Sequence, residues 1–277
     1  MSASIQRMSV AASADPARDA DLLAQTALAV RAAGSALRER FGDVVRHETR
    51  EELMRALAAN DDAALDILRP RLAVLRPDAG WVEDELAGGA LPPGEWWIVD
   101  PAEGNVNHLH ALPEWAVTAT LVRDNQPVLT AVHLPLTGET YTALAGGGAH
   151  LDGRPLRVSR TTDLGLSLVA TSQARPDEDE EVVRRVGSSI TAMLFDALVV
   201  RTSVPATLHL LNVAASRIDA FWQFAGARAD LLPGALLVAE AGGRISDAEG
   251  SSWSPGSESF LAAAPGVHAE AVVTLSL

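Results

Sequence analysis

Apolar side chains recur between residues 21 and 41 at alternating steps of four and three, the spacing of one face of an α-helix. These positions are Leu23, Ala27, Val30, Gly34, Leu37 and Phe41. The pattern predicts an amphipathic helix that packs this face on a core. Gly42 and Asp43 predict its end, because glycine favours the backbone conformation that terminates helices.

A second helical pattern lies between residues 60 and 75, with apolar positions Leu65, Leu68, Leu72 and Leu75. Asn60, Asp61 and Asp62 precede it. Short polar side chains of this kind favour a helix start, since they accept hydrogen bonds from the first free N–H groups. Pro70 predicts a kink or an early end, because proline lacks the N–H that a helix interior needs.

Short apolar stretches with the character of β-strands follow. The predicted strands of the first half are 96–100, 116–122, 128–134 and 140–144, with a hairpin turn at 124–126. In the second half, strands are predicted at 166–171, 218–221 and 244–246, and helices at 208–216 and 230–241. Residues 177–181 read as an acidic loop or a helix start.

The order of these elements predicts a layered fold in two halves. The first half is an α+β unit with a mostly antiparallel sheet, and the second alternates strand and helix. We expect a flexible tail over residues 1–20, an N-terminal half over 21–160 and a C-terminal half over 161–277. A ligand site between the halves is the expected arrangement.

Composition narrows the chemistry that the chain can perform. The 277 residues contain 36 acids against 22 basic residues, every one of them arginine, and no cysteine. Lysine Schiff bases, phosphate-loop lysines, thiolate nucleophiles and disulfides are thereby excluded. The net charge of −14 argues against nucleic acid and anionic membrane as partners. With no long apolar run in the sequence, we expect a cytoplasmic protein.

Carboxylates are therefore the main candidates for reactive or metal-binding side chains in this chain. Asp61, Asp84 and Asp230 each lie where a predicted element starts or ends, as do Asp100 and Glu103. The segment 100–104 places two carboxylates three residues apart on a tight turn, and hard oxygen ligands of this kind suit Mg²⁺. On local pattern alone, an Asp-Pro turn without a metal explains this segment equally well.

The arrangement of these acids resembles the inositol monophosphatase family of magnesium-dependent phosphatases. Its signature D-P-x-D-G-T-x-N-F corresponds to residues 100–108, and its upstream G-E-E to 83–85. The second signature, W-D-x-x-A/P-G followed by E-A-G-G, corresponds to 229–234 and 240–243, and a glycine-rich hairpin to 147–159. The resemblance covers about residues 20–265 and implies the family's fold, an αβαβα sandwich of the α+β or α/β class.

The resemblance also implies roles for individual residues. One metal would be held by Asp84, Asp100 and the Ala102 carbonyl, and a second would bridge Asp100, Glu103 and Asp230. Asp61, Asn105 and Asp84 are the catalytic candidates that it implies. The cofactor would be one to three Mg²⁺ ions, or Mn²⁺, because two such cations neutralise the phosphate and activate a bound water.

Several positions differ from the family pattern. Asp84 stands in place of glutamate, Glu103 in place of aspartate and Asn105 in place of threonine. An amide orients a water but cannot pass on a proton as a hydroxyl does. On the substrate side, Gln223 replaces an acidic residue that grips inositol hydroxyls. The substrate-binding candidates are Gly104, Asn105, His108, His110, Arg201 and Gln223.

The leading hypothesis is a phosphoric monoester hydrolase that acts on a small phosphorylated metabolite other than an inositol phosphate. One alternative is a repurposed enzyme of specialised metabolism that performs a cyclisation, elimination or transfer on the same fold. The other is a catalytically silent member that binds or scaffolds. A homodimer is expected from the resemblance alone.

Overall fold

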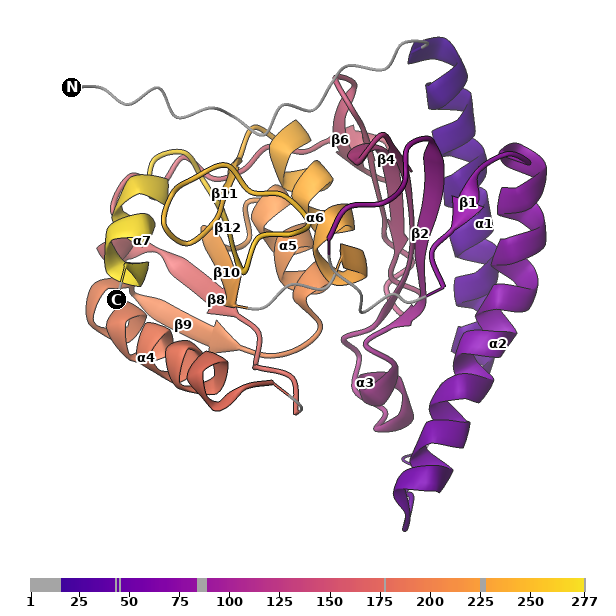
Figure 1. The fold of residues 1–277 in the computed structure, drawn as a ribbon, viewed down its shortest axis with the longest axis horizontal. Helices are drawn as coiled ribbons and strands as arrows, with labels where there is room; N and C mark the ends of the chain where they lie inside the picture. The colour runs from indigo at the N-terminus through magenta and orange to yellow at the C-terminus, as the bar shows by residue number, and fades with distance from the viewer. Residues whose placement is uncertain are drawn as a thin grey trace.

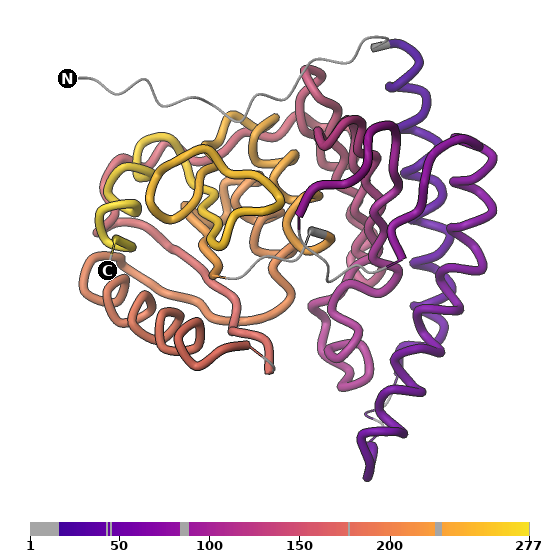
Figure 2. The backbone as a smooth tube through the Cα atoms, in the orientation of Figure 1, coloured from indigo at the N-terminus to yellow at the C-terminus, as the bar shows by residue number. Residues whose placement is uncertain are grey.

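The computed structural model describes residues 16–42, 44, 46–83, 89–176, 178–224 and 228–276. The described chain forms five alternating layers: helices, a sheet, helices, a second sheet and helices (Figure 1). This confirms the αβαβα sandwich expected from the sequence. Figure 2 shows that the indigo-to-magenta part of the chain builds one side of the molecule and the orange-to-yellow part the other.

The first sheet has seven strands in the order of the chain. They are β1 (Gly80–Trp81), β2 (Glu95–Glu103), β3 (Ala116–Arg123), β4 (Gln126–His133), β5 (Thr140–Leu144), β6 (Gly148–Leu151) and β7 (Arg154–Pro155). All neighbours pair antiparallel except β1 and β2, which are parallel. Three of the four strands predicted here therefore lie within two residues of their observed bounds, and the fourth, β2, extends beyond its predicted end.

The second sheet has five strands in the order β11-β12-β10-β8-β9. They are β8 (Leu168–Thr171), β9 (Val199–Thr202), β10 (Ala220–Phe224), β11 (Arg244–Ser246) and β12 (Ser259–Ala263). Strands β9, β8 and β10 run parallel, and β12 runs antiparallel to both β10 and β11. A short 3₁₀ turn, Leu164–Leu166, leads into β8. The carboxyl ends of the three parallel strands meet at one edge, which is where ligands usually bind in such sheets.

Two long helices, α1 (Pro16–Arg40) and α2 (Arg50–Leu75), cover the outer face of the first sheet (Figure 1). Alternate residues of β2 point to opposite faces, so Trp97 and Val99 pack beneath these helices whereas Ile98 points to the other side. At the far end of the molecule, α4 (Glu180–Asp196) and α7 (His268–Leu275) cover the second sheet.

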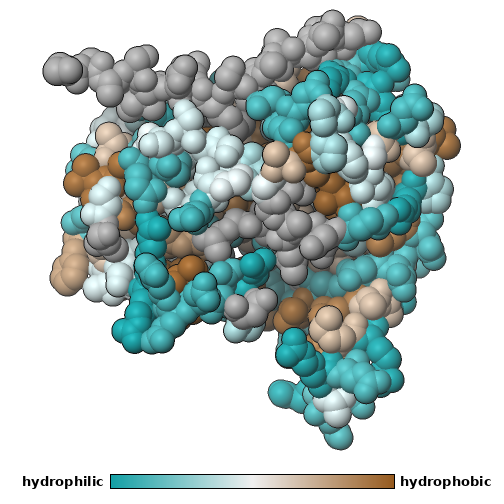
Figure 3. All heavy atoms as spheres, viewed as in Figure 1, coloured by the Kyte–Doolittle hydropathy of each residue, from teal (hydrophilic) through white to brown (hydrophobic). Residues whose placement is uncertain are grey.

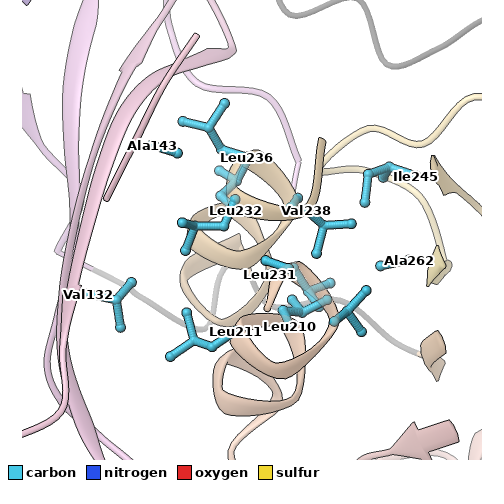
Figure 4. Close-up of a cluster of buried hydrophobic side chains, with 14 of the residues drawn as sticks. Val132, Ala143, Leu210, Leu211, Leu231, Leu232, Leu236, Val238, Ile245 and Ala262 are labelled. Atoms are coloured by element: carbon cyan, nitrogen blue, oxygen red, sulfur yellow. The ribbon is translucent and has the colours of Figure 1, made fainter. Parts of the chain in front are cut away.

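The central layer consists of α5 (Ala206–Ala214) and α6 (Arg228–Glu240), which lie between the two sheets. Residues 231–238 of α6 are all buried. Figure 4 shows Leu211, Leu232 and Leu236 directed toward Val132 and Ala143 of the first sheet, and Leu231 and Val238 directed toward Ile245 and Ala262 of the second. Because this layer meets apolar side chains on both sides, it holds the two halves together.

The helix starts differ from the sequence-based expectations. Helix α1 begins at Pro16, so residues 16–20, assigned to the flexible tail, are helical. Within them, Asp19 is buried and pairs with Arg76 at 3.0 Å and with Arg123 at 3.3 Å. These two ion pairs fix the first turn of α1. The local sequence carries no signal that predicts this turn, because both arginines lie far away along the chain.

Helix α2 begins at Arg50, and the prediction of a start at Asn60–Asp62 is wrong. Thr49 caps the helix by accepting a hydrogen bond from the backbone N–H of Glu52 at 3.2 Å, and the helix continues through Pro70 to Leu75. Asn60 and Asp61 therefore lie in mid-helix. Their polarity reflects tertiary contacts rather than a helix end.

Strand β2 also continues past its predicted end at Asp100. It runs through Pro101 to Glu103, with a register shift against β3 between Asp100 and Glu103. Gly104 follows with φ of 81°, a left-handed conformation in which a Cβ would meet the Glu114 carbonyl oxygen at 2.6 Å. The short helix α3 (Asn105–Leu109) begins directly after it. None of the described helices is long and apolar enough to cross a membrane.

The close contact between α5 and α6 predicts a large cost for one added methyl group. A Cβ on Gly234 would lie 2.2 Å from the Cβ of Leu210, so Gly234→Ala must push the helices apart. We expect it to lower the free energy of unfolding by about 2–3 kcal/mol, as overpacking does. Gly187→Ala, in α4 with nothing within 4 Å, is the matched control and should raise it by about 0.5–1 kcal/mol. Urea unfolding of both variants measures this, and equal effects would contradict it.

Candidate active site

A cleft of about 450 Å³ lies where the two halves meet. Its walls come from α2, the end of β2 and the start of α3 on one side. On the other they come from the loops after β8 and before α5, the end of β10 and the start of α6. In Figure 3 the surface is hollowed between the lower part of the C-terminal half and the projecting ends of α2 and α3. The cleft thus lies at the carboxyl ends of β8 and β10 in the second sheet.

Three carboxylates converge on one side of this cleft. Asp100 lies in β2, Glu103 is the last residue of that strand, and Asp230 lies in the first turn of α6. One carboxylate oxygen from each lies within 4.8 Å of the others. Residues 130 positions apart in sequence are therefore brought to one point by the junction of the two halves.

The backbone around the cluster holds these carboxylates in place. The Ala102 N–H donates to Asp100 Oδ1 at 2.9 Å, which turns that carboxylate back over the bulge. The Thr207 hydroxyl lies 2.9 Å from Glu103 Oε2 and 2.8 Å from the Asp230 carbonyl oxygen, and its single proton is within reach of both acceptors. Thr207, at the start of α5, thus connects the two halves at the cluster, and no motif in the sequence singled it out.

The electrostatics of the cluster favour a bound cation. Burial raises the pKa of Asp230 to about 6, and the positive charge of Arg175 opposes this shift. Glu103 is buried and Asp230 is partly buried, so water screens these two charges less than it screens surface charges. Three hard oxygen donors at this spacing suit Mg²⁺ or Mn²⁺, and the Ala102 carbonyl lies in the same wall. Asp84, also predicted as a ligand, lies outside the described residues.

Asp61 and Asn105 also line the cleft, as α2 and α3 meet there. The Asn105 side-chain N–H groups donate to Asp61 Oδ1 at 2.7 Å and to the Leu57 carbonyl at 3.0 Å. Burial raises the pKa of Asp61 to about 6; the hydrogen bond from Asn105 lowers it, and the negative charge of Asp62 raises it. A carboxyl group of this pKa both accepts and releases a proton near neutral pH.

Two further predicted substrate contacts lie in the cleft. Gly104 lines it at the turn between β2 and α3. Gln223, on β10, accepts a hydrogen bond from the Ser172 hydroxyl at 2.5 Å and faces the same space. Ser172 follows β8, and sequence analysis did not select it.

The other three predicted contacts lie away from the cleft lining. His108 is only 4% exposed, and its ring packs on Phe41 and Trp115 with centroids 5.4 and 4.8 Å away. His110 ends α3 and is exposed, and Arg201 is exposed on β9. Among the described residues, none of these three borders the cleft. The predicted contacts His108 and His110 are therefore not part of the cleft, because His108 packs in the core and His110 lies exposed directly after α3.

Arg175 is the cation that sequence analysis missed. Of the described residues that line the cleft, it alone carries a positive side chain, and its Nε donates to Glu178 at 2.8 Å. Arg175 lies in the loop after β8, shortly before the acidic segment 177–181 of the sequence. The available signal was its place after a parallel strand, since loops at such strand ends carry binding residues.

Comparisons with known proteins agree with this geometry. The sequence profile of the inositol monophosphatase family matches residues 19–276. Inositol monophosphatase 3 of Solanum lycopersicum is 30% identical over 230 residues, which cover 81% of this chain and 85% of that protein. Nus factor SuhB of Pseudomonas aeruginosa is 33% identical over 200 residues, covering 72% of each. The IMPase structure from Thermotoga maritima superimposes with a TM-score of 0.79 at 26% identity, covering 92% of this chain and 96% of that one.

The cluster predicts stabilisation by divalent cations. A cation that binds only the folded chain stabilises it by about 2.7 kcal/mol at a hundredfold excess over its Kd. We expect Mg²⁺ to raise the melting temperature, EDTA to reverse this, and Glu103→Gln to remove most of the shift. Glu51→Gln, the same change at a carboxylate with 81% of its side chain exposed, should keep it. Differential scanning calorimetry measures this, and an equal Mg²⁺ response in both variants would exclude a metal at the cluster.

Proposed function

The chain belongs to the inositol monophosphatase family, and on that premise we propose that it is a metal-dependent phosphatase of a small phosphorylated metabolite other than an inositol phosphate. The observation that carries the proposal is the convergence of Asp100, Glu103 and Asp230 in a cleft that Asp61 also lines. Together these groups would supply cation ligands and a proton acceptor in one cleft.

Asp100, Glu103, Asp230 and the Ala102 carbonyl would hold one to three Mg²⁺ or Mn²⁺ ions, with Asp84 as the further predicted ligand. When bound, such ions neutralise the phosphate charge and lower the pKa of a coordinated water. The protein's part is to fix the ligand oxygens. Thr207 does so by holding both Glu103 and the first turn of α6.

In the hydrolytic step, the oxygen of a water forms the new bond to phosphorus while one water proton passes to Asp61. The ester P–O bond breaks, and the alcohol product takes a proton from solvent. Asp61 then returns its proton to solvent, so the products are an alcohol and inorganic phosphate. The Asn105 amide keeps Asp61 directed at the cleft through its hydrogen bond at 2.7 Å.

Anion binding does not require lysine. Arg175 contributes a positive charge near Asp230, and the backbone N–H groups at Gly104 and Asn105 begin a helix at the cleft wall. Charge-assisted contacts of this kind are about twice as strong as neutral hydrogen bonds. Arg175 and these N–H groups therefore favour a substrate that carries a phosphate or a second anionic group.

The rest of the cleft supports a substrate less hydroxylated than inositol. Met54, Leu57, Val106, Val204 and Phe224 contribute apolar surface to its lining. Gln223 offers an amide, already hydrogen-bonded to Ser172, where the family has a carboxylate. An amide lacks the charge that makes carboxylate–hydroxyl hydrogen bonds strong, so selectivity for a polyol is weakened.

We expect the purified chain with Mg²⁺ to release phosphate from at least one member of a broad phosphomonoester panel. Its kcat/KM should be lower for inositol 1-phosphate than for the best substrate. Asp61→Asn should lower kcat by about 10²-fold or more, the contribution typical of a general base. Malachite green detection of phosphate measures both quantities. Absence of any release, together with absence of a Mg²⁺ effect on stability, would contradict the proposal.

A specific observation favours a second candidate, non-hydrolytic chemistry on the same cleft. Asn105 has no hydroxyl, and both of its amide hydrogens are donated within the protein. The same panel distinguishes the candidates: a phosphorylated compound that is converted with Mg²⁺ but releases phosphate without incorporating ¹⁸O from labelled water would support elimination or cyclisation. A silent binding member would bind phosphate compounds and convert none.

We also propose a homodimer formed through the end of α4 and the edge strand β9. Leu194, Phe195, Leu198 and Val199 are exposed there, and Phe195 is 86% exposed. β9 is the last strand of the second sheet, so one side of it lacks a strand partner within the described chain. Sedimentation should give twice the mass of one chain. Phe195→Arg should give a monomer, whereas Val74→Arg, at a 79% exposed site on α2, should leave the dimer intact.

A further inference from the structure

A buried chain of polar side chains lies behind the cleft wall and joins α1, α2 and α3. Its centre is Asn60, which is 2% exposed although asparagine seldom avoids water completely. Asn60 Oδ1 accepts from Arg40 Nε at 2.9 Å. Asn60 Nδ2 lies 2.9 Å from Asn105 Oδ1 and 3.1 Å from His108 Nδ1. Every side-chain polar atom of Asn60 thus has a partner, and one of these partners, Asn105, lines the proposed active site.

One end of this chain is fixed by a backbone carbonyl. His108 Nε2 lies 2.9 Å from the Leu37 carbonyl oxygen, which can only accept a hydrogen bond. Nε2 must therefore carry the proton. Burial lowers the pKa of His108 and the charge of Arg40 lowers it further, so the ring stays neutral even though the bond to Leu37 raises the pKa. In the neutral ring Nδ1 then accepts, which requires that Asn60 Nδ2 point toward it.

The other end is fixed by an arginine. A guanidinium group only donates, so the Asn60 oxygen must face Arg40 and its nitrogen must face away. Both ends thus impose the same orientation on the Asn60 amide. Asn105 is then fixed in turn, because its oxygen must meet the Asn60 nitrogen at 2.9 Å. Asn105 Nδ2 is left to donate to Leu57 and to Asp61 Oδ1.

The consequence reaches the carboxylate in the cleft. Asp61 Oδ1 is held as an acceptor by Asn105, so a proton arriving at Asp61 is placed on Oδ2. An amide cannot pass a proton along, unlike the threonine hydroxyl of the family pattern. Oδ2 must therefore take the proton from water directly, and its direction depends on how Asn105 is held.

We infer that Asn60 is a positioning residue of the active site, which together with Arg40 and His108 sets the orientation of the Asn105 amide and hence the oxygen that Asp61 presents for proton transfer. The inference rests on the proposed function for its catalytic meaning. The hydrogen-bond polarity itself is a property of the folded chain and is measurable without turnover.

The first test is the tautomer of His108 in the wild-type chain, measured by long-range ¹H–¹⁵N NMR at neutral pH. The expected result is a neutral ring protonated at Nε2. A ring protonated at Nδ1 would reverse the donor and acceptor roles at Asn60 and overturn the inference. The result of this measurement does not depend on whether the chain hydrolyses phosphate esters.

The second test is Asn60→Asp, which keeps the acceptor for Arg40 and removes both donors. Asn105 is then expected to turn its nitrogen toward residue 60 and its oxygen toward Asp61, which removes the hydrogen bond to Oδ1. The ¹³Cγ titration of Asp61 should move to higher pH. With 4-nitrophenyl phosphate and Mg²⁺, kcat should fall by about 10-fold or more, part of the contribution of a general base. KM should change less than kcat, because Asn60 itself is not part of the cleft lining.

Two comparisons separate positioning from a purely structural role. Asn60→Ala removes the donors without adding a charge and should move the Asp61 titration in the same direction. Asn125→Asp is the control, since the Asn125 amide is likewise held at both its oxygen and its nitrogen, by the Leu91 N–H at 2.6 Å and the Leu91 carbonyl at 3.0 Å, but lies outside the cleft. It should leave kcat and the Asp61 titration unchanged. Unchanged Asp61 titration in both Asn60 variants would overturn the inference, whereas an inactive wild type with the expected titration shifts would contradict only the proposed function.

Discussion

Residues 231–238 of helix α6 are buried between the two sheets, and the position of Asp230 in the candidate site depends on that burial. Because these residues are packed against apolar side chains of both sheets, the helix can neither rotate nor slide without opening the core. Asp230 lies one residue before this stretch. Its carboxylate is therefore placed against the end of β2 by apolar packing, and the Thr207 hydroxyl secures the same junction from α5. The packing of the core therefore also sets the geometry of the candidate site.

The apolar packing of the core offsets the electrostatic cost of placing like charges close together at the cleft. Asp100, Glu103 and Asp230 repel one another at their observed spacing, and a chain with a net charge of −14 and no lysine has few means to relieve this. Arg175 supplies one positive charge near Asp230. The proposed cations would supply further compensation, because the same three side chains that repel one another also offer oxygen donors.

Sequence analysis predicted the layered fold, most strands and the convergence of Asp100, Glu103 and Asp230, because those features are encoded locally and by family motifs. Features set by tertiary contacts escaped it. Asn60–Asp62 read as a helix start, although Thr49 with Glu52 three residues later carries the stronger capping signature. The polarity of Asn60 and Asp61 is explained by partners on α1 and α3, more than forty positions away for Asn105. His108 was predicted as a substrate contact, but its ring bonds to the carbonyl of Leu37, 71 residues away, and no local pattern indicates this partner.

The orientation of the Asn105 amide also bears on how such a site changes over generations. A threonine at 105 would offer a hydroxyl to Asp61, but Asn60 Nδ2 would lose one of its two acceptors and the Leu57 carbonyl would lose the bond from Asn105. A buried group that loses its partner costs about 1–3 kcal/mol. The step back toward the family residue is therefore uphill unless position 60 changes with it. Positions 60 and 105 are therefore coupled, and the cost of an exchange at one of them depends on the side chain at the other.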